Sequence, residues 1–373
     1  MAVITNKWIG TEFFKVNDFN HIECYVGNAK QSLYYYSAVM GLKPIAYKGP
    51  ETGCKDSVSY VLNKNHINLV LTTPLSSMHP ASNWLLKHGD GIYDVSLNVE
   101  NAKEAYESCL NRGALSASDY QNETTENGDY NTASIKTYGD VVHSFVENSN
   151  YNGIWAPGFE KYQGANFKSY DTKLIRIDHI VGNVEENKMN YWRDFYENIF
   201  GFANFVVFDE TDISTQFSSL KSRVMRSKNW KVKLPINEPA QGLKKSQIQE
   251  YLDFNEGPGI QHVALLTADI ANSISSLRKN GMEFLNVPDT YYDDLLSRIG
   301  SIDESIDLMK ELKILIDRDD DGYLLQLFTK PVQDRPTLFY EFIQRKGSQG
   351  FGQGNFQALF EAIEREQDKR GNL

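Results

Sequence analysis

The strongest constraint on the fold is an internal repeat. Residues 20–29 and residues 178–184 both contain His-Ile followed by a Gly-Asn pair, and each leads into a helix-like segment. Residues 91–97 and 259–265 both begin Gly-Ile, alternate in polarity, and lead into an amphipathic helix that ends at a Gly. Period-two strands and helices closed by Gly predict a strand–helix–strand–strand–strand module, present twice in each half.

This repeat predicts an α+β protein. We expect two tandem domains of paired βαβββ modules that form open, barrel-like sheets, followed by a C-terminal lid helix. With 373 residues the chain can form two separate cores. Asn, Gly and Pro cluster over residues 151–159, which predicts the junction there. We therefore expect a structural domain over residues 1–158 and a catalytic, metal-binding domain over residues 159–373.

Charge and composition exclude several classes of partner. The net charge is −11, which disfavours binding to a nucleic-acid backbone or an anionic membrane surface. No apolar run approaches the roughly 18 residues of a membrane span, and the first residues lack the pattern of a signal peptide. The scattered Cys24, Cys54 and Cys109 are typical of reduced thiols, which predicts a cytoplasmic protein.

Three residues of the second half have the chemistry of a metal site. His179 and His262 are the only histidines after residue 143, and Glu341 stands in a strand-like apolar run. A buried carboxylate is unfavourable without a cation, and two imidazoles with one carboxylate are the ligand set of a non-haem Fe(II) site. For either histidine alone, a hydrogen-bonded core residue is the more favoured interpretation. For Glu341 alone, a buried ion pair is the alternative.

The first half retains only part of this set. His21 occupies the place of the first histidine, while Asp94 and Ser144 stand at the other two places in the internal alignment. The same strands are thus built without a complete ligand set. This contrast favours a metal site in the second half and a structural role for the first.

Polar and aromatic residues surround the three candidate ligands in the sequence. Gln326 and Phe328 share a strand face, and Gln261 directly precedes His262. Ser222, Asn237 and Gln247 lie in or beside residues 237–246, a polar segment with Pro and Gly that predicts a surface or cavity-lining loop. Because buried amides need partners, these residues indicate a polar ligand. Hydrogen bonding to the backbone alone is the alternative.

The C-terminal segment predicts a lid. Three alternating glycines precede Asn355, a candidate N-cap, after which Phe356, Leu359, Phe360 and Ile363 form one apolar helix face. A helix that simply packs on the core would explain this face equally well. A Gly-rich hinge before an aromatic helix also suits a lid that excludes water. The βαβ context of a nucleotide-binding loop is missing.

Several long motifs resemble one known family. They lie at residues 177–184, 234–240, 245–251, 257–262, 330–337, 350–356 and 370–373. On these motifs the chain resembles the 4-hydroxyphenylpyruvate dioxygenase family of the vicinal-oxygen-chelate superfamily, over nearly its whole length. The resemblance implies that 4-hydroxyphenylpyruvate and O2 are converted to homogentisate and CO2 in tyrosine and phenylalanine catabolism. It also implies a homodimer with no nucleic-acid or membrane partner.

The resemblance also implies a set of site residues. The Fe(II) ligands would be His179, His262 and Glu341. The residues that orient the substrate during catalysis would be Ser222, Asn237, Gln247, Gln261 and Gln326. The remaining substrate contacts would be Phe328, Phe339, Phe351, Asn355, Phe356 and, from the apolar helix face, Leu359.

Two alternatives of different kinds stay open at this point. The first is 4-hydroxymandelate synthase, which uses the same substrate but hydroxylates the benzylic carbon. Members of that family tend to have an aliphatic residue where Phe356 stands, so the aromatic residue favours ring hydroxylation. The second is a non-catalytic binding protein on the same fold, whose sequence would show an incomplete ligand set.

Overall fold

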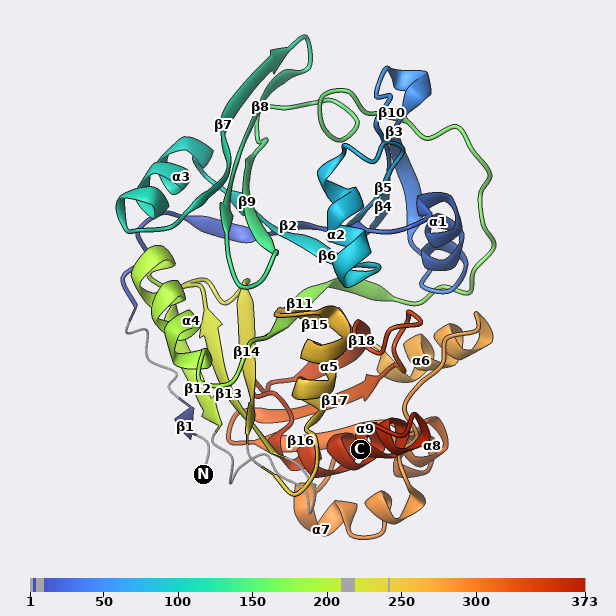
Figure 1. Ribbon diagram of the computed structural model, residues 1–373. Helices are drawn as coiled ribbons and strands as arrows, with labels where there is room; N and C mark the ends of the chain where they lie inside the picture. The colour runs from blue at the N-terminus through green and yellow to red at the C-terminus, as the bar shows by residue number, and fades with distance from the viewer. Residues whose placement is uncertain (1–2, 5–9, 209–218, 241, 373) are drawn as a thin grey trace.

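The computed structural model describes residues 3–4, 10–208, 219–240 and 242–372, and in these its strands form two nine-stranded sheets. The N-terminal sheet lies above the C-terminal sheet in Figure 1. Its strand order is β10-β3-β4-β5-β2-β6-β9-β8-β7. The order in the C-terminal sheet is β1-β12-β13-β14-β11-β15-β18-β17-β16.

The elements of the N-terminal half alternate between strands and single helices. The strands are β2 (Val16–Tyr25), β3 (Lys43–Lys48), β4 (Ser57–Lys64), β5 (Ile67–Pro74), β6 (Gly91–Val99), β7 (Ser116–Thr125), β8 (Gly128–Lys136), β9 (Val142–Glu147) and β10 (Glu160–Lys161). The helices are α1 (Ala29–Ala38), the short η1 (Pro50–Thr52), α2 (Pro80–His88) and α3 (Ala102–Asn111).

The C-terminal half follows the same order and adds helices at its end. The strands are β11 (Leu174–Asn183), β12 (Ala203–Phe208), β13 (Ser219–Arg226), β14 (Lys233–Ala240), β15 (Gly259–Thr267), β16 (Leu315–Asp319), β17 (Gly322–Phe328) and β18 (Phe339–Lys346). The helices are α4 (Met189–Phe195), η2 (Tyr196–Phe200), α5 (Gln247–Asn255), α6 (Ile270–Lys279), η3 (Asp289–Tyr292), α7 (Leu295–Ile299), α8 (Ile306–Leu312), η4 (Gln353–Asn355) and α9 (Phe356–Lys369). Within the described residues, none of them is long and apolar enough to cross a membrane.

Each half consists of two βαβββ modules, which confirms the predicted fold class. In every module the first strand pairs in parallel with the last, as in β2 with β5 and β15 with β18. The two modules of a half join through antiparallel pairing of their first strands, β2 with β6 and β11 with β15. Helices α3 and α6 begin at side-chain caps, Asn101 and Asp269. Each is followed by a glycine with positive φ, Gly113 and Gly281, as the repeat predicted.

The strand registers confirm the internal alignment. Glu23, two residues after His21, lies opposite Asp94. In the same way Val181, two residues after His179, lies opposite His262. Strands β9 and β18 pair at matching positions as well, so Ser144 takes the place of Glu341. The two halves therefore share a backbone frame in which individual side chains can be compared.

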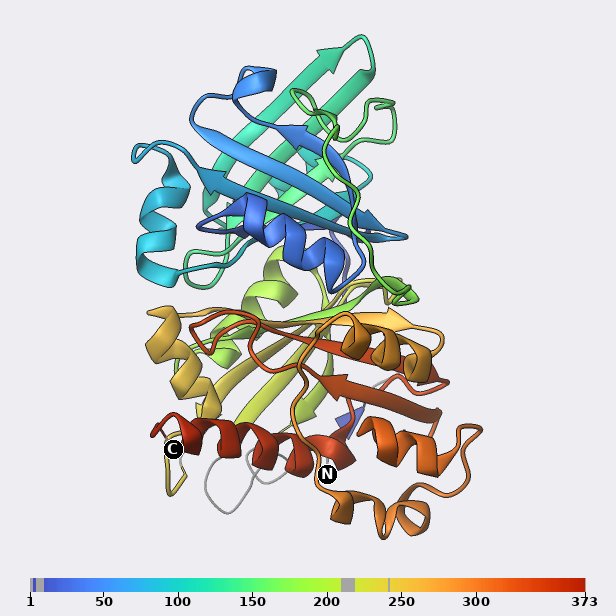
Figure 2. The ribbon, with the colours of Figure 1, turned by 90° about the vertical axis from the view of Figure 1, so that its right-hand side faces the viewer.

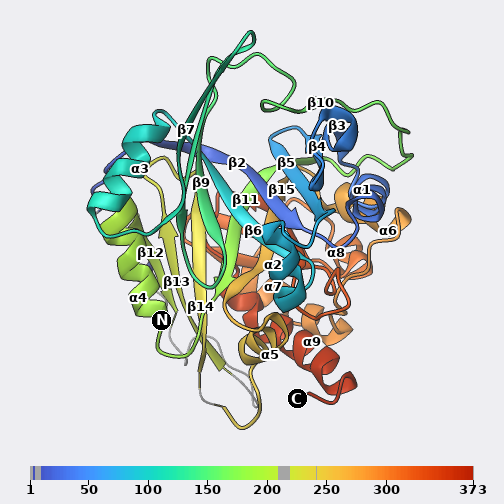
Figure 3. The ribbon, with the colours of Figure 1, turned by 45° about the horizontal axis from the view of Figure 1, so that its top comes forward.

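The two halves pack on each other through a shared hydrophobic core and through buried polar contacts. One hydrophobic core cluster includes residues of both halves. The hydroxyl groups of Tyr36 and Tyr340 lie 3.2 Å apart, and His143 Nε2 lies 2.7 Å from the hydroxyl oxygen of Tyr196. Helix α2 lies against α5, as seen from above in Figure 3.

Short strands exchange between the ends of the two halves. Strand β1 (Val3–Ile4) pairs with β12 at the edge of the C-terminal sheet. Strand β10, just beyond the predicted boundary at residue 158, pairs with β3 of the N-terminal sheet. Because each of these strands pairs with the sheet on the other side of the predicted boundary, the division into residues 1–158 and 159–373 stays a proposal.

The loop predicted over residues 237–246 is a strand in its first part. Residues 237–240 belong to β14, residue 241 lies outside the described residues, and residues 242–246 form neither helix nor strand, as predicted. Asn237 lies within β14, opposite Ser222 of β13, and its side chain is buried. Pro239 favoured a loop in the sequence, because proline is rare inside sheets. A proline removes only its own backbone donor, however, and β14 continues through both Pro235 and Pro239.

Candidate metal centre and substrate cavity

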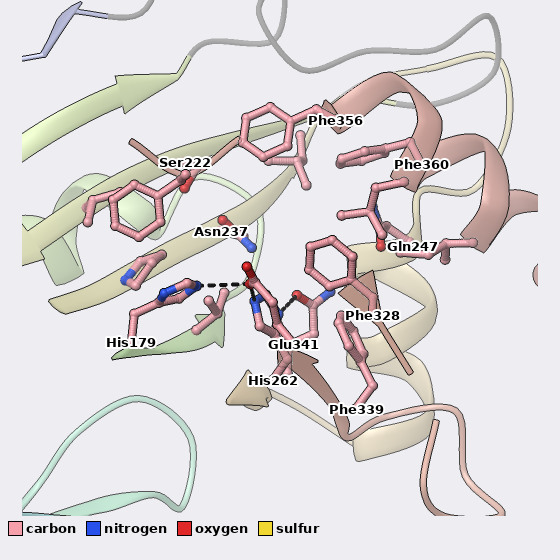
Figure 4. Close-up of a pocket in the computed structure, with 18 residues that line it drawn as sticks. His179, Ser222, Asn237, Gln247, His262, Phe328, Phe339, Glu341, Phe356 and Phe360 are labelled. Atoms are coloured by element: carbon pink, nitrogen blue, oxygen red, sulfur yellow. Dashed lines mark hydrogen bonds and ion pairs between the residues drawn. The ribbon is translucent and has the colours of Figure 1, made fainter. Parts of the chain in front are cut away.

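Three adjacent strands bring the candidate ligands together. His179 is on β11, His262 on β15 and Glu341 on β18, and these strands are neighbours in the C-terminal sheet. The Nε2 atom of His179 lies 3.1 Å from Glu341 Oε2, and that of His262 lies 3.5 Å from the same oxygen (Figure 4). One ligand atom from each residue lies within 4.8 Å of the others, and all three side chains are buried.

The electrostatics of this group suit a divalent cation. Burial raises the pKa of the Glu341 carboxyl, but the two imidazoles lower it more, to about 2. Burial lowers the pKa of His262, whereas Glu341 and Asp178 raise that of His179 against the effect of burial. A buried carboxylate with two imidazoles directed at it is the donor set that binds a transition metal, so the residues present fit such an ion.

Each imidazole is held through its other nitrogen. His179 Nδ1 lies 2.8 Å from Asp178 Oδ2, and His262 Nδ1 lies 3.1 Å from Gln261 Oε1. Both partners are oxygen acceptors, so Nδ1 carries the proton and the Nε2 lone pair faces the other ligands. This arrangement, in which an outer residue fixes the tautomer, is typical of metal-binding histidines.

Asp178 is the centre of a buried charge network. Arg345 forms two hydrogen bonds to its carboxylate, of 2.9 and 2.8 Å, and Lys233 Nζ lies 3.3 Å from both oxygens. Although burial raises the pKa of Asp178, these two cations hold it well below its usual range. Burial lowers the pKa of Lys233 to about 8 against the attraction of Asp178. The carboxylate that orients His179 is therefore itself held in place.

The ligands face a cavity that is lined by side chains of the C-terminal half. Its polar lining residues, apart from the ligands, are Ser222, Asn237, Gln247 and Gln261. Its aromatic rings are those of Phe328, Phe339, Phe351, Phe356 and Phe360. The Phe339 ring stacks on His262 with centroids 4.8 Å apart, and the Phe351 ring lies 5.0 Å from that of His179.

Helix α9 covers the cavity. It runs along the lower face of the C-terminal sheet in Figure 2, and in Figure 4 Phe356 and Phe360 extend from it towards the cavity. Leu359 and Ile363 complete the predicted apolar face, and all four residues line the cavity. Asn355 is the N-cap residue as predicted, but its side chain does not cap the helix. Its Oδ1 instead accepts a hydrogen bond of 2.6 Å from Tyr291.

The structure brings nine of the eleven predicted substrate residues to the cavity lining. They are Ser222, Asn237, Gln247, Gln261, Phe328, Phe339, Phe351, Phe356 and Leu359. Gln326 and Asn355 are fully buried and are not part of this lining. Both amide atoms of Gln326 lack a hydrogen-bond partner within the described residues, and its Nε2 lies 2.5 Å from where a Cβ on Gly352 would be. A direct contact between either residue and a substrate remains a prediction.

Six further lining residues were not among the predicted site residues. They are Val181, Leu220, Val224, Pro235, Phe360 and Ile363. Four of them stand two positions from a predicted ligand or polar residue on the same strand, so strand alternation could have found them. The other two belong to the apolar helix face that the sequence already indicated.

The fold and this site define the class of protein. Residues 176–327, which include His179 and His262, match the family model of the Glyoxalase/Bleomycin resistance protein/Dioxygenase superfamily. The chain is 46% identical to 4-hydroxyphenylpyruvate dioxygenase of Coccidioides posadasii, over 95% of this chain and 94% of the relative. The corresponding proteins of Yarrowia lipolytica and Tetrahymena thermophila are 44% and 43% identical, each over 95% of this chain and over 93% and 91% of the relative.

The chain therefore belongs to the 4-hydroxyphenylpyruvate dioxygenase family, and it is an enzyme of the dioxygenase class. Solved structures agree with this placement. A triple mutant of 4-hydroxymandelate synthase from Streptomyces coelicolor superposes with a TM-score of 0.84 at 29% identity. That likeness covers 94% of this chain and 99% of the synthase.

Proposed function

We propose that this enzyme binds Fe(II) through His179, His262 and Glu341 and converts 4-hydroxyphenylpyruvate and O2 to homogentisate and CO2. The buried His-His-Glu group that opens onto an aromatic cavity is the observation that carries this proposal. Two imidazoles and one carboxylate leave coordination positions open and are the ligand set of non-haem Fe(II) oxygenases. When bound, Fe(II) supplies positions for the α-keto acid and O2 and the redox chemistry that releases CO2 and hydroxylates the ring.

The charges of the chain suit this substrate. Glu341 contributes one negative charge to the buried site, and the carboxylate of the keto acid contributes a second. Together they offset a divalent cation, so the loaded site is near neutral and can stay buried. The cavity lining includes no other Asp, Glu, Lys or Arg within the described residues.

The cavity lining divides into apolar and polar groups with separate tasks. Phe328 and Phe356 hold the aromatic ring of the substrate by stacking, and α9 excludes water from the cavity. Ser222 and the amides of Asn237, Gln247 and Gln261 orient the phenol hydroxyl through hydrogen bonds, because these are the groups in the lining that can donate and accept. The chain thus positions the substrate, while the metal carries the oxidation.

The test is anaerobic purification with Fe(II), iron quantitation, and chromatography of the products from 4-hydroxyphenylpyruvate and O2. We expect close to one iron per chain, O2 uptake that depends on the keto acid, and homogentisate with CO2 in equal amounts. A protein that binds iron but consumes no O2 with this substrate would refute the assignment. No iron binding at all would point instead to a non-catalytic binding protein.

A second candidate is supported by the likeness to 4-hydroxymandelate synthase. That activity would hydroxylate the benzylic carbon of the same substrate. Phe356 lines the cavity, and the resemblance described above associates an aromatic residue at this position with hydroxylation of the ring. Hydroxymandelate in place of homogentisate would select this alternative.

The proposal includes two statements about context. We propose that the enzyme works as a homodimer in the cytoplasm. Light scattering during size-exclusion chromatography of the iron-loaded protein, with a 42.5 kDa chain as the unit, tests the dimer. A mass of one chain or of four chains would contradict it.

A further inference from the structure

Arg345 connects the candidate metal centre with the segment that leads into α9. It stands four residues after Glu341 on β18, and its side chain is only 10% exposed. Through Nε and Nη2 its guanidinium donates two hydrogen bonds to Asp178, of 2.9 and 2.8 Å. Through Nη1 it donates to the carbonyl oxygens of Gly350, at 2.7 Å, and Ser348, at 3.2 Å.

These bonds form a continuous path from a metal ligand to the lid. His179 Nδ1 donates to Asp178 Oδ2, Asp178 accepts from Arg345, and Arg345 donates to Gly350 O. The guanidinium is planar and presents its donors in a fixed fork, so a movement of Asp178 is transmitted to the Gly350 carbonyl. Phe351, the next residue, lines the cavity and contacts the His179 ring.

The segment between β18 and α9, residues 347–355, is the hinge of the lid. Gly347 and Gly352 have φ of 90° and 75°, a conformation that favours glycine. Asp319 and Asp317 of β16 also hold the hinge, by accepting from the backbone N–H groups of Gly350 and Gly354 at 3.0 Å. These carboxylates fix the hinge to the sheet but do not lead to a metal ligand. Arg345 does.

The N-terminal half has neutral amides where this network stands. In the shared register Asp178 corresponds to Asn20, which lies 2.8 Å from Nδ1 of His21. By the same registers, Asn68 stands at the place of Lys233 and Asn148 at the place of Arg345. The fold can therefore be built without the charges. They accompany the half that has the complete ligand set and the helical lid.

We propose that Arg345 is a positioning residue that couples metal binding at His179 to closure of α9. This inference rests on the metal site of the proposed function. A metal bound at Nε2 fixes the His179 ring, and the ring fixes Asp178, the guanidinium and the hinge in turn. Because coupling between two sites is reciprocal, a closed lid also strengthens metal binding.

The experiment is hydrogen–deuterium exchange of the backbone amides of α9, with and without anaerobic Fe(II). In the unsubstituted enzyme we expect Fe(II) to slow exchange in α9 about tenfold, a typical coupling between two sites. Arg345→Gln should bind Fe(II) with about tenfold weaker affinity, because Asp178, the hydrogen-bond partner of the ligand His179, is disturbed. At saturating Fe(II) the variant should still be fully loaded. Its α9 should exchange at the same rate with and without Fe(II).

A matched control lies at the other end of the same helix. Arg370 donates two hydrogen bonds to Glu250 of α5, at 3.1 and 2.7 Å, and so anchors the end of α9 far from the hinge. Arg370→Gln should raise exchange in α9 in both states but keep the effect of Fe(II). A general loosening of the helix is thereby distinguished from a loss of coupling.

The outcomes are separable. If Arg345→Gln keeps the full effect of Fe(II) on α9, or if iron binds to the unsubstituted enzyme without slowing exchange, the coupling is refuted. Absence of iron binding in the unsubstituted enzyme would remove both this inference and the proposed function. Should Arg345→Gln fail to fold, Arg345→Lys replaces it. A single ammonium retains the charge near Asp178 but lacks the fork that bridges to the hinge, so the effect of Fe(II) should again be lost.

Discussion

The concave faces of the two sheets share one backbone frame but differ in what they hold and in what covers them. The C-terminal face carries the three candidate metal ligands under the helix α9. At the same places the N-terminal face carries His21, Asp94 and Ser144. Its cover is a loop in which Trp155 and Phe159 pack on the sheet, with the Trp155 ring 5.4 Å from that of His21.

The two halves therefore differ in two respects: a few side chains on the strands, and whether a loop or a helix covers the sheet. These two differences distinguish a cavity with candidate ligands from a packed core. A loop packed directly on the strands places aromatic side chains where the other half has a cavity. A helix on a glycine hinge leaves a cavity over its strands. The repeat therefore provides an internal reference against which each functional residue can be tested.

The largest contrast is expected between the two equivalent histidines. Glu341→Ala or His179→Ala should lower keto-acid-dependent O2 uptake about 1,000-fold or more, because the metal loses a ligand. His21→Ala should change uptake by less than about twofold, since its ring contacts Trp155 and Asn20 and not the cavity. Uptake is followed with an oxygen electrode, and bound iron is quantified in each variant. Equal activity in all three variants would contradict the ligand assignment.

The two covers should differ next. Deletion of the residues after Asn355 removes α9 and should lower kcat/KM about 100-fold, because the cavity opens to water and the ring contacts are lost. Trp155→Ala should lower the free energy of unfolding by about 2–3 kcal/mol and leave turnover nearly unchanged. Steady-state kinetics and urea denaturation measure the two effects. A fully active truncated enzyme would show that α9 only packs on the sheet.

The smallest effect concerns the buried carboxyl of Asp94. Burial, together with the nearby carboxylate of Glu23, raises its pKa from 3.8 to about 7 in the folded protein, against two hydrogen bonds from Ser144 that lower it. Between about pH 4 and pH 7 the folded state therefore holds this proton more tightly than the unfolded state does. Stability should fall as the pH rises through this window. This fall should amount to about 1–3 kcal/mol of unfolding free energy, and we expect it to be absent in Asp94→Asn, whose side chain does not titrate.

Urea denaturation at pH 5 and pH 8 checks this expectation. The excess stability of Asp94→Asn over the unsubstituted protein should be larger at pH 8 than at pH 5. Asp171→Asn is the control, because Asp171 is largely exposed and the nearby Lys64 and Lys173 lower its pKa. Asp171→Asn should therefore show the same fall in unfolding free energy from pH 5 to pH 8 as the unsubstituted protein. An unchanged fall in Asp94→Asn would show that other groups cause it.

Much of the fold could be predicted because the same order of strands and helices occurs in both halves of the sequence. Each module presents an alternating strand, a capped helix and a terminal glycine, and those local signals agreed with the tertiary structure. The strand over residues 237–240 was missed since Pro239 is a strong local breaker in sequence. The strand is continued by pairing with β13, which is a tertiary effect.

Some of the site residues could be predicted from the sequence, and others could not. His179, His262 and Glu341 could be predicted as a group because residue type and strand placement both pointed to them. The positions of Gln326 and Asn355 beside the hinge could not, since they depend on how the chain folds back after β18. The role of Arg345 was hidden for a similar reason. Its partner Asp178 is 167 residues away in sequence.

Strand β1 has a consequence for how the chain can be synthesised and handled. Its pairing partner in β12 lies about 200 residues further along, so on the ribosome the first residues wait until more than half of the polypeptide has emerged. A fragment beginning at residue 159 would have an unpaired edge at β12, and such edges promote aggregation. A purification tag is thus better attached by a long flexible linker than fused directly before Val3.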